Sequence, residues 1–249
     1  MAESSSGRGA GKSMIVVGAG DATGGAIARR FAREGYAACV CRRNADRLEP
    51  LVAQIEAEGG KARAFGIDAR DEDQIVGFFK TVEEEVGPLE VVVFNIGANV
   101  NFPITETTAR VYRKVWEMAA FSGFLTGREA ARLMTPRASG TIIFTGATAS
   151  LRGGKGFSAF AGAKFALRAL AQSMARELGP RGIHVAHSII DGAIDTAWIR
   201  ENFPAAAERD KDGGILKPDD IAESYWQLHV QPRTAWTHEL DLRPWMESW

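Results

Sequence analysis

A single stretch near the amino terminus, residues 13–31, constrains the fold of this chain more than any other. It reads SMIVVGAGDATGGAIARRF and opens with a short apolar, β-branched run that is typical of a buried strand. A glycine-rich turn follows, and then a segment with helical spacing. A strand, a glycine-rich turn and a helix form the first unit of a dinucleotide-binding fold, because the turn lets a pyrophosphate approach the helix N-terminus. A lone turn of this kind can merely close a loop, but its position between strand and helix favours a nucleotide site.

Apolar, strand-like runs alternate with helical segments along the rest of the chain. Further strands are expected at residues 37–41, 62–67, 89–94, 141–145, 183–190 and 236–242, and helices at 44–58, 71–86, 106–134, 157–178 and from Pro218. The connections are too long for hairpins. The pattern therefore predicts an α/β fold, a three-layer doubly wound parallel sheet, with ligands bound at the carboxyl ends of the strands. Residues 195–214 are expected to be irregular and to close over a ligand.

Length and composition limit the classes of protein to consider. The 249 residues suffice for one large domain, expected over residues 13–249 after a flexible tail at 1–12. A net charge of −1 argues against a nucleic-acid partner, and no apolar run approaches the roughly 18 residues of a membrane span. Cys39 and Cys41 lie two apart on an expected strand, where a disulfide is geometrically poor, so we expect reduced core cysteines in a cytoplasmic protein.

The histidines do not suggest a metal site, and the tryptophans suggest packing or contact roles. His184 and His187 lie three apart on an expected strand and so face opposite sides, while the other two histidines are isolated in the sequence. Tryptophans crowd the carboxyl terminus, and they could belong to the core, to a pocket wall or to a subunit contact, which we favour. These tryptophans are Trp226, Trp236, Trp245 and Trp249.

Several motifs together resemble the short-chain dehydrogenases/reductases over nearly the whole chain. They are the glycine loop from Gly18 to Gly24, Asp68, Asn95-Ile96-Gly97, Lys164 within Phe160-Ala-Gly-Ala-Lys164, and Asp191-Gly192-x-x-x-Thr196. The resemblance implies a Rossmann fold that carries NAD or NADP and moves a hydride to or from a carbonyl/alcohol carbon. It also implies a homodimer or homotetramer assembled through two long helices.

The chain departs from the family pattern where the chemistry should take place. Phe160 stands at the position of the family's tyrosine, Ala147 at that of its serine, and Ala119 at that of its asparagine. Only Lys164 survives of this set. Ala22 replaces the middle glycine of the loop, and Asp191 stands where a proline is usual.

The resemblance also implies a set of cofactor contacts. Arg42 and Arg43 stand where an acidic residue would favour NAD, and a guanidinium suits a 2′-phosphate, so NADP is expected rather than NAD. The alternative is that these arginines only end a strand in water and that Lys164 is a solvated helix lysine. The implied contacts are Gly18, Gly20, Ala22 and Gly24 with the pyrophosphate, Asp68 with the adenine amine, Asn95 and Gly97 with the adenosine ribose, Lys164 with ribose hydroxyls, and Gly192, Ile194 and Thr196 around the nicotinamide amide.

Three functions remain open at this stage. The first is an oxidoreductase with a substitute for the tyrosine proton, whose loss removes general acid catalysis of about 10²–10⁴-fold. A hydroxyl such as that of Thr148 would more plausibly orient a water, whereas Lys164 could donate directly if burial lowers its pKa. The second function is a non-catalytic NADP-binding sensor, and the third is a structural subunit with a vestigial site. Other candidate substitutes are Thr145, Ser158, Tyr112 and Asp191.

Overall fold

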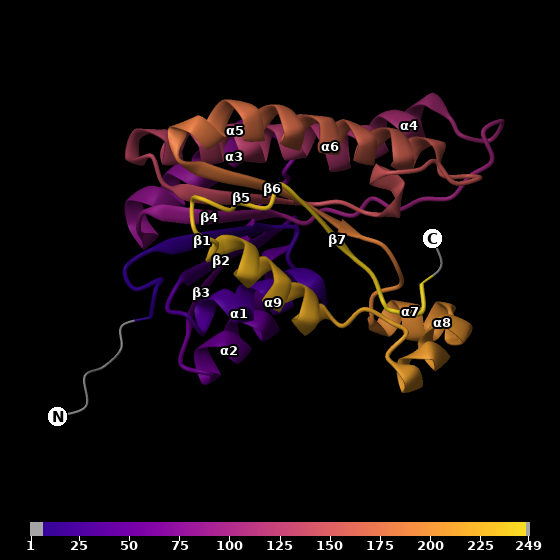
Figure 1. Cartoon of the computed structure of the whole chain (residues 1–249), viewed down its shortest axis with the longest axis horizontal. Helices are drawn as coiled ribbons and strands as arrows, with labels where there is room; N and C mark the ends of the chain where they lie inside the picture. Colours follow the sequence, from indigo (N-terminus) through magenta and orange to yellow (C-terminus); the bar gives the residue numbers. More distant parts are fainter. Residues whose placement is uncertain (1–6, 248–249) are drawn as a thin grey trace.

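A parallel sheet of seven strands runs through the middle of the molecule (Figure 1), in a computed structural model that describes residues 7–247 without the Ala206 side chain. The strand order is β3-β2-β1-β4-β5-β6-β7, and every neighbouring pair is parallel. This confirms the predicted doubly wound α/β fold. The strands are β1 Ser13–Val17, β2 Ala37–Arg42, β3 Lys61–Gly66, β4 Leu89–Phe94, β5 Gly140–Thr145, β6 Ile183–Ile190 and β7 Glu239–Leu242.

Helices cover both faces of the sheet, so the molecule has three layers. In Figure 1, α1, α2 and α9 lie below the sheet, and α3 to α6 lie above it. Two further short helices, α7 and α8, lie apart at the lower right. The helices are α1 Thr23–Ala32, α2 Glu49–Ala57, α3 Glu72–Thr81, α4 Ala109–Trp116, α5 Ser122–Met134, α6 Ser158–Leu178, α7 Ala197–Asn202, α8 Pro204–Glu208 and α9 Pro218–His229.

Side chains adjoining the helices account for several of their boundaries. Asn44 accepts a hydrogen bond from the Asp46 N–H at 3.0 Å and so starts the 3₁₀ turn that leads into α2. Asp71 caps α3 in the same way, through the Gln74 N–H at 3.1 Å. Between α4 and α5 a wider, π-helical turn, Glu117–Phe121, continues the helix without a break.

The sequence-based boundaries differ most from the structure in three places. The helix expected from residue 106 begins at Ala109, because the Thr108 hydroxyl caps it by accepting from the Val111 N–H. The last strand begins at Glu239 rather than at 236, because Gln231 bonds Thr237 through both its amide atoms and holds residues 231–237 in a turn. Residues 195–214 are not irregular: they form α7, α8 and a 3₁₀ turn, Arg209–Asp212.

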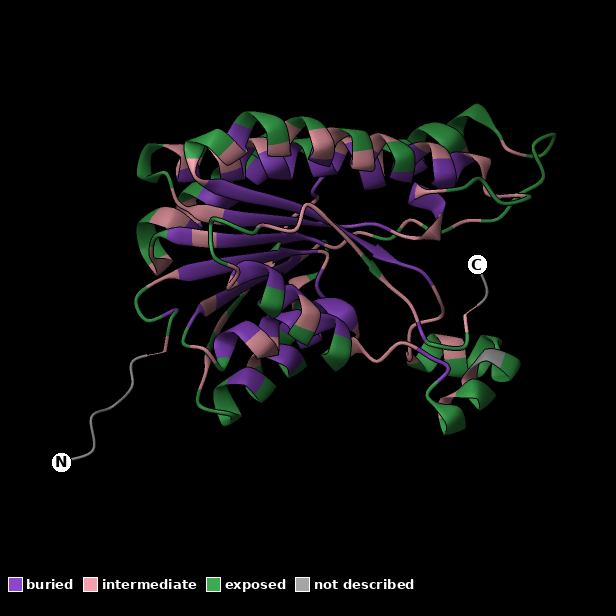
Figure 2. Ribbon diagram, in the orientation of Figure 1, coloured by how far each residue is buried: buried purple, intermediate pink, exposed green. Residues whose placement is uncertain are grey.

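The hydrophobic core has two main layers, one on each face of the sheet, and a smaller third cluster lies between α4 and the start of α6. The central strands are almost entirely buried (Figure 2), whereas the edge strands β3 and β7 are half-buried to exposed. Cys39 and Cys41 are free and buried in the layer beneath α3. Trp226 belongs to the other layer, where it packs edge-on against Phe31 with ring centres 5.3 Å apart. The favoured subunit-contact role is therefore wrong for Trp226, while Trp249 lies outside the described residues.

Part of the expected flexible tail packs against the body of the protein. The Gly9 N–H donates to the Glu34 carbonyl at 2.8 Å, and Lys12 forms an ion pair with Glu90. A Cβ at Gly9 would lie 2.3 Å from the Tyr36 ring, so the turn sits directly on that side chain. Residues 1–6 of the tail lie outside the described part of the chain.

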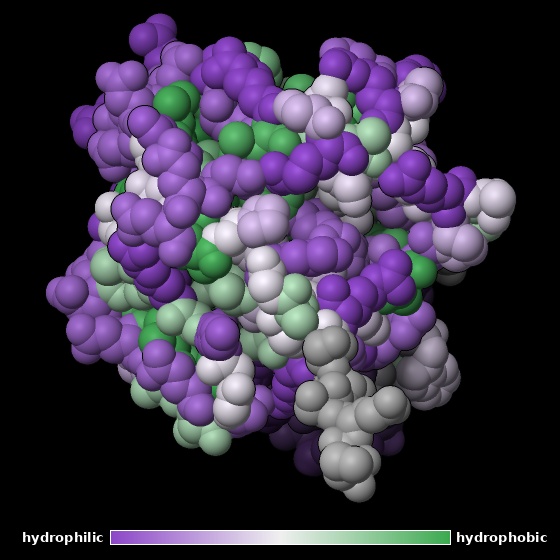
Figure 3. All heavy atoms as spheres, turned by 90° about the vertical axis from the view of Figure 1, so that its left-hand side faces the viewer, coloured by the Kyte–Doolittle hydropathy of each residue, from purple (hydrophilic) through white to green (hydrophobic). Residues whose placement is uncertain are grey.

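Figure 3 shows the face at the left of Figure 1, where the strands begin, and hydrophilic side chains cover most of what is visible there. The carboxyl ends of the strands lie on the opposite side of the molecule. Across residues 7–247, no helix combines the length and apolarity that crossing a membrane would require.

Candidate functional site

A cleft of about 1130 Å³ opens at the carboxyl ends of the strands. It lies over β1 and β4, where the strand order reverses direction, which is the usual ligand site of doubly wound sheets. Its lining residues come from the glycine turn, from the ends of β2 to β6 and from the first turns of α6. The expected cofactor residues all line it: Gly18, Gly20, Ala22, Gly24, Arg42, Arg43, Asp68, Asn95, Gly97, Lys164, Gly192, Ile194 and Thr196.

The glycine turn packs too closely against β4 and its own backbone to accommodate side chains at Gly18 and Gly24. Gly18 has φ +88°, and a Cβ there would lie 2.9 Å from Ile96, while one at Gly24 would lie 2.9 Å from the Gly18 carbonyl oxygen. Asn95 fastens the turn to β4 by donating to that oxygen at 3.2 Å. The α1 N-terminus begins after Ala22, which offers no side-chain cap, so its amides remain directed at the cleft. The turn therefore fits the pyrophosphate of a dinucleotide.

Arginines concentrate at the end of the cleft next to β2 and β3. Arg42 and Arg43 line it at the end of β2, and within residues 7–247 neither forms an ion pair with a carboxylate. Arg47 and Arg70 line the same end, and sequence reasoning missed both. Arg70 could have been found from its place two residues after Asp68, just beyond the end of β3.

Asp68 is engaged within the protein. Its carboxylate accepts from Arg70 Nε at 2.9 Å and from Nη2 at 2.5 Å, and this pairing holds the pKa of Asp68 below its ordinary value. The expected contact of Asp68 with an adenine amine would have to be made alongside this bidentate pair. Arg70 also reduces the negative charge beside Arg43.

Lys164 is buried at the bottom of the cleft with 2% of its surface exposed. Its ammonium donates to the carbonyl oxygens of Ile96 at 3.0 Å and Thr145 at 2.8 Å. Burial lowers the pKa of Lys164 to about 7, because the charged form loses its hydration. The alternative of a solvated helix lysine is wrong, and this side chain can exchange a proton near neutral pH.

The three positions at which the family resemblance implies a replacement differ in their access to the cleft. Phe160 and Ala147 both line it, and the Phe160 ring centre lies 5.9 Å from the Lys164 ammonium. Ala119 is fully buried in the π-helical turn, where the neighbouring Met118 reaches the cleft instead. The side chains at these positions supply no proton donor.

Asp191, which the sequence placed in a family motif and among the candidate acids, is a buried carboxylate behind the cleft-lining Thr148. Asp191, 2% exposed at the end of β6, accepts a hydrogen bond from the Thr148 hydroxyl. Its other oxygen lies 3.2 Å from Arg243, and Arg152 lies 3.8 Å away. Its polar type immediately after an apolar strand was the available signal.

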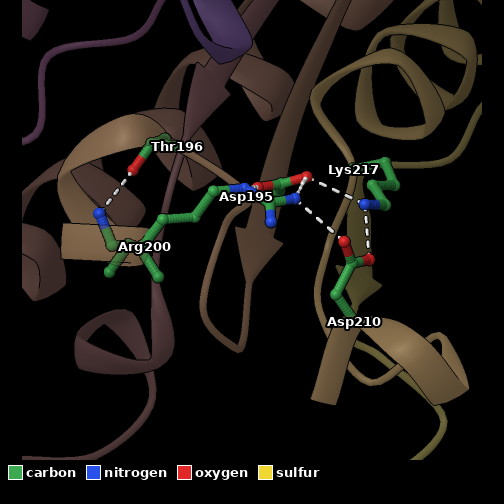
Figure 4. A network of polar contacts seen from close by, with 6 residues as sticks. Asp195, Thr196, Arg200, Asp210 and Lys217 are labelled. Carbon is green, nitrogen blue, oxygen red and sulfur yellow. Dashed lines mark hydrogen bonds and ion pairs between the residues drawn. The ribbon is translucent and has the colours of Figure 1, made fainter. Parts of the chain in front are cut away.

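Residues 195–217 carry a compact network of ion pairs beside the cleft (Figure 4). Arg200 contacts Asp195 at 2.6 Å and Asp210 at 2.9 Å, and Lys217 contacts both carboxylates. Thr196 caps α7 by accepting from the Ile199 N–H at 3.1 Å. The network joins α7, the turn after α8 and the residue preceding α9, so this segment is held as one unit.

The histidines take part in structural contacts rather than in a metal cluster. Within residues 7–247, no group of three or more metal-ligating side chains is close enough to hold an ion. His187 faces Glu239 at 3.1 Å, and His184 stacks on Trp236 with ring centres 4.9 Å apart. His229, which is isolated from other histidines in the sequence, hydrogen-bonds to Tyr36 at 2.8 Å and to Thr141 at 2.9 Å.

The sheet order, the crossover at β1 and β4 and the glycine turn define a protein of the Rossmann class. The family model of the short chain dehydrogenases matches residues 12–206. The chain therefore belongs to the short-chain dehydrogenase/reductase family of oxidoreductases, as the sequence motifs implied.

Individual relatives agree with this assignment. A crystal structure of a short-chain dehydrogenase from Rhodopseudomonas palustris is 52% identical, with a TM-score of 0.82 over 94% of this chain and 99% of that one. An alcohol dehydrogenase from Thermococcus sibiricus, complexed with 5-hydroxy-NADP, is 26% identical, with a TM-score of 0.79 over 95% and 98%. A short-chain dehydrogenase/reductase from Armillaria gallica is 31% identical over 75% of this chain and 72% of its own length.

Proposed function

We propose that the protein binds NADP in the cleft and acts as an atypical oxidoreductase on a carbonyl or alcohol substrate. The observation that carries the proposal is the pairing of a glycine cradle with arginines Arg42 and Arg43, which have no carboxylate partner within residues 7–247. A guanidinium pairs with a phosphate through parallel hydrogen bonds, and a 2′-phosphate is what distinguishes NADP from NAD. The NADP analogue bound to the Thermococcus sibiricus relative is in keeping with this cofactor.

The remaining cofactor contacts are assigned by position along the cleft. Gly18, Gly20, Ala22 and the α1 N-terminus would hold the pyrophosphate, and Asn95 and Gly97 would border the adenosine ribose. Lys164 would face the ribose hydroxyls, while Gly192, Ile194 and Thr196 would border the nicotinamide amide. Asp68 would meet the adenine amine from within its pair with Arg70.

The bound cofactor would supply the hydride, and a side chain of the protein would have to donate or accept the proton at the substrate oxygen. We assign that task to Lys164, because it lines the cleft and its lowered pKa of about 7 lets it hold or release a proton at neutral pH. Phe160 and Ala147 would enclose the substrate with apolar surface and exclude water. Lys164 is thus the proposed catalytic residue, in place of a tyrosine.

A second candidate, an NADP-binding protein without turnover, is favoured by a specific observation. Lys164 already donates to two main-chain carbonyls, so two of its three protons are engaged within the protein. In this alternative the lysine supports the cleft and the cofactor, and no proton reaches a substrate.

Titration with NADPH and with NADH, followed by reduced-nicotinamide fluorescence, tests the cofactor proposal. We expect micromolar binding of NADPH and weaker binding of NADH. Arg42→Ala with Arg43→Ala should weaken NADPH binding by about 10- to 100-fold, the loss of one or two charge-assisted hydrogen bonds, with NADH little changed. Arg33→Ala, which removes an exposed arginine paired with Glu58, is the matched control. Failure of the wild type to bind either nucleotide would contradict the proposal.

The outer face of α4, α5 and α6 supports a proposed homodimer or homotetramer. Tyr112, Trp116, Phe124 and Phe165 are each 40–45% exposed there. Large aromatic side chains grouped on one face are typical of subunit contacts. Light scattering should show an assembly that Phe124→Lys with Phe165→Lys dissociates, and a monomeric wild type would contradict it.

The buried free cysteines are consistent with the proposed cytoplasmic location.

A further inference from the structure

Thr148 places a hydroxyl in a part of the cleft that several apolar side chains and Arg152 line. It follows Ala147 in the 3₁₀ turn Thr148–Ser150 after β5 and is half-buried where it lines the cleft. Apolar side chains border the cleft on either side of it in the chain and from the helices opposite. They are Met118, Ala147, Ala149, Phe157 and Phe160.

The Thr148 hydroxyl has only one direction in which to donate its proton. Its Oγ1 hydrogen-bonds to Asp191 Oδ1, and a carboxylate oxygen accepts but does not donate. The single hydroxyl proton therefore lies between these two oxygens. What Thr148 can still offer to a ligand is a lone pair, which accepts a hydrogen bond.

Asp191 holds this arrangement in place from within the protein. Its side chain is 2% exposed, and Arg243 lies 3.2 Å from Oδ2 while Arg152 lies 3.8 Å from Oδ1. These contacts come from the segment after β7 and from the loop after β5, so the carboxylate is fixed by two different parts of the chain. Turning the Thr148 proton toward a ligand would give up a charge-assisted hydrogen bond, which is stronger than one between neutral groups.

We propose that Thr148 is a specificity-determining residue that selects ligands bearing a hydrogen-bond donor, a hydroxyl or an amine, on an apolar body. The inference rests on the proposed function, because it assigns a substrate class to the same cleft. A ligand whose oxygen can only accept, such as an ether, would face the Thr148 lone pair without a hydrogen bond. The alcohol form of a substrate is thereby bound in preference to a non-donating analogue.

The test compares benzyl alcohol and benzylamine with benzyl methyl ether, which keeps the aromatic body and loses the donor. Binding to the protein with and without NADPH is measured by saturation-transfer NMR competition, where no turnover is needed. We expect the two donors to bind about 3- to 10-fold more tightly than the ether, the contribution of one neutral hydrogen bond. Thr148→Val should abolish this preference and Thr148→Ser should keep it.

Two further variants separate the proposed cause from a general disturbance. Asp191→Asn should reduce the preference for donors, because its amide can donate to Thr148 and free the hydroxyl proton for the ligand. Thr107→Val, which removes a hydroxyl that bonds the Pro103 carbonyl oxygen away from the cleft, should change nothing. Equal binding of donors and ether, binding of none of them, or a preference that survives Thr148→Val would overturn the inference. Absence of NADPH binding in the same samples would instead contradict the proposed function.

Discussion

The ammonium of Lys164 lies 5.9 Å from the centre of the Phe160 ring, one helical turn earlier on α6, with no phenol oxygen between them. The lysine instead donates to the main-chain oxygens of Ile96 and Thr145. No carboxylate of residues 7–247 forms an ion pair with it, and burial lowers its pKa to about 7. The site thus places a buried lysine beside an apolar ring, at the position where the family resemblance implies a tyrosine.

Restoring the two polar groups should strengthen carbonyl reduction. Phe160→Tyr with Ala147→Ser adds a phenol near an ammonium and a hydroxyl to hold the substrate oxygen, so we expect kcat/KM to rise by about 10²–10⁴-fold. NADPH oxidation with a panel of ketones and aldehydes measures the change. Phe157→Tyr with Ala149→Ser places the same groups elsewhere along the cleft and is the matched control. An equal gain in the control would show that added polarity, and not its position, is responsible.

Lys164 should make the protein more stable as the pH rises above neutral. The unfolded chain holds the lysine proton up to a pH of about 10.4, whereas the folded protein releases it near 7. Between these values the unfolded state binds more protons, so the free energy of unfolding increases with pH. Urea unfolding at a series of pH values should show this slope, and Lys164→Met should flatten it. An unchanged slope in the variant would mean that the lysine keeps its ordinary pKa.

Two buried histidines should give a pH dependence of the same sign in the acidic range. Burial lowers the pKa of His187 to about 4 and that of His229 to about 3, against an ordinary value near 6.5. The unfolded chain therefore takes up protons below about pH 6.5 that the folded protein excludes, and stability falls as the pH decreases. His187→Gln with His229→Gln should be less stable at pH 7 and lose stability less steeply on acidification. A parallel pH dependence in variant and wild type would contradict this prediction.

The ion pairs around Arg200 should hold the segment of α7 and α8 in place. Arg200→Met leaves Asp195 and Asp210 with Lys217 as their remaining cationic partner, so we expect faster proteolysis and amide exchange within residues 195–213. The global Tm should change little, because the network is on the surface. Lys211→Met removes a pair with Glu208 in the same segment and should leave exchange unchanged. Equal protection in both variants would show that the network does not hold the segment.

Local sequence determined the order of the elements and the place of the cleft. The apolar run, glycine turn and helix at residues 13–31 required a strand-turn-helix unit, and the alternation that followed required a parallel sheet. The replacements that the family resemblance implies at Phe160 and Ala147 could also be predicted from the sequence, from their spacing to Lys164. These features depend on residues that are close together in the chain, so they can be predicted from short-range sequence patterns.

Contacts between distant segments decided the rest. Thr148 and Asp191 are 43 residues apart and Asp191 and Arg243 are 52 apart, so only the packing of β5, β6 and the segment after β7 brings them together. Burial set the pKa of Lys164, and the fold placed Trp226 and His229 in the interior. The exposure and the contacts of a side chain depend on which helices and strands cover it. This covering exists only once the layers of the fold have packed together.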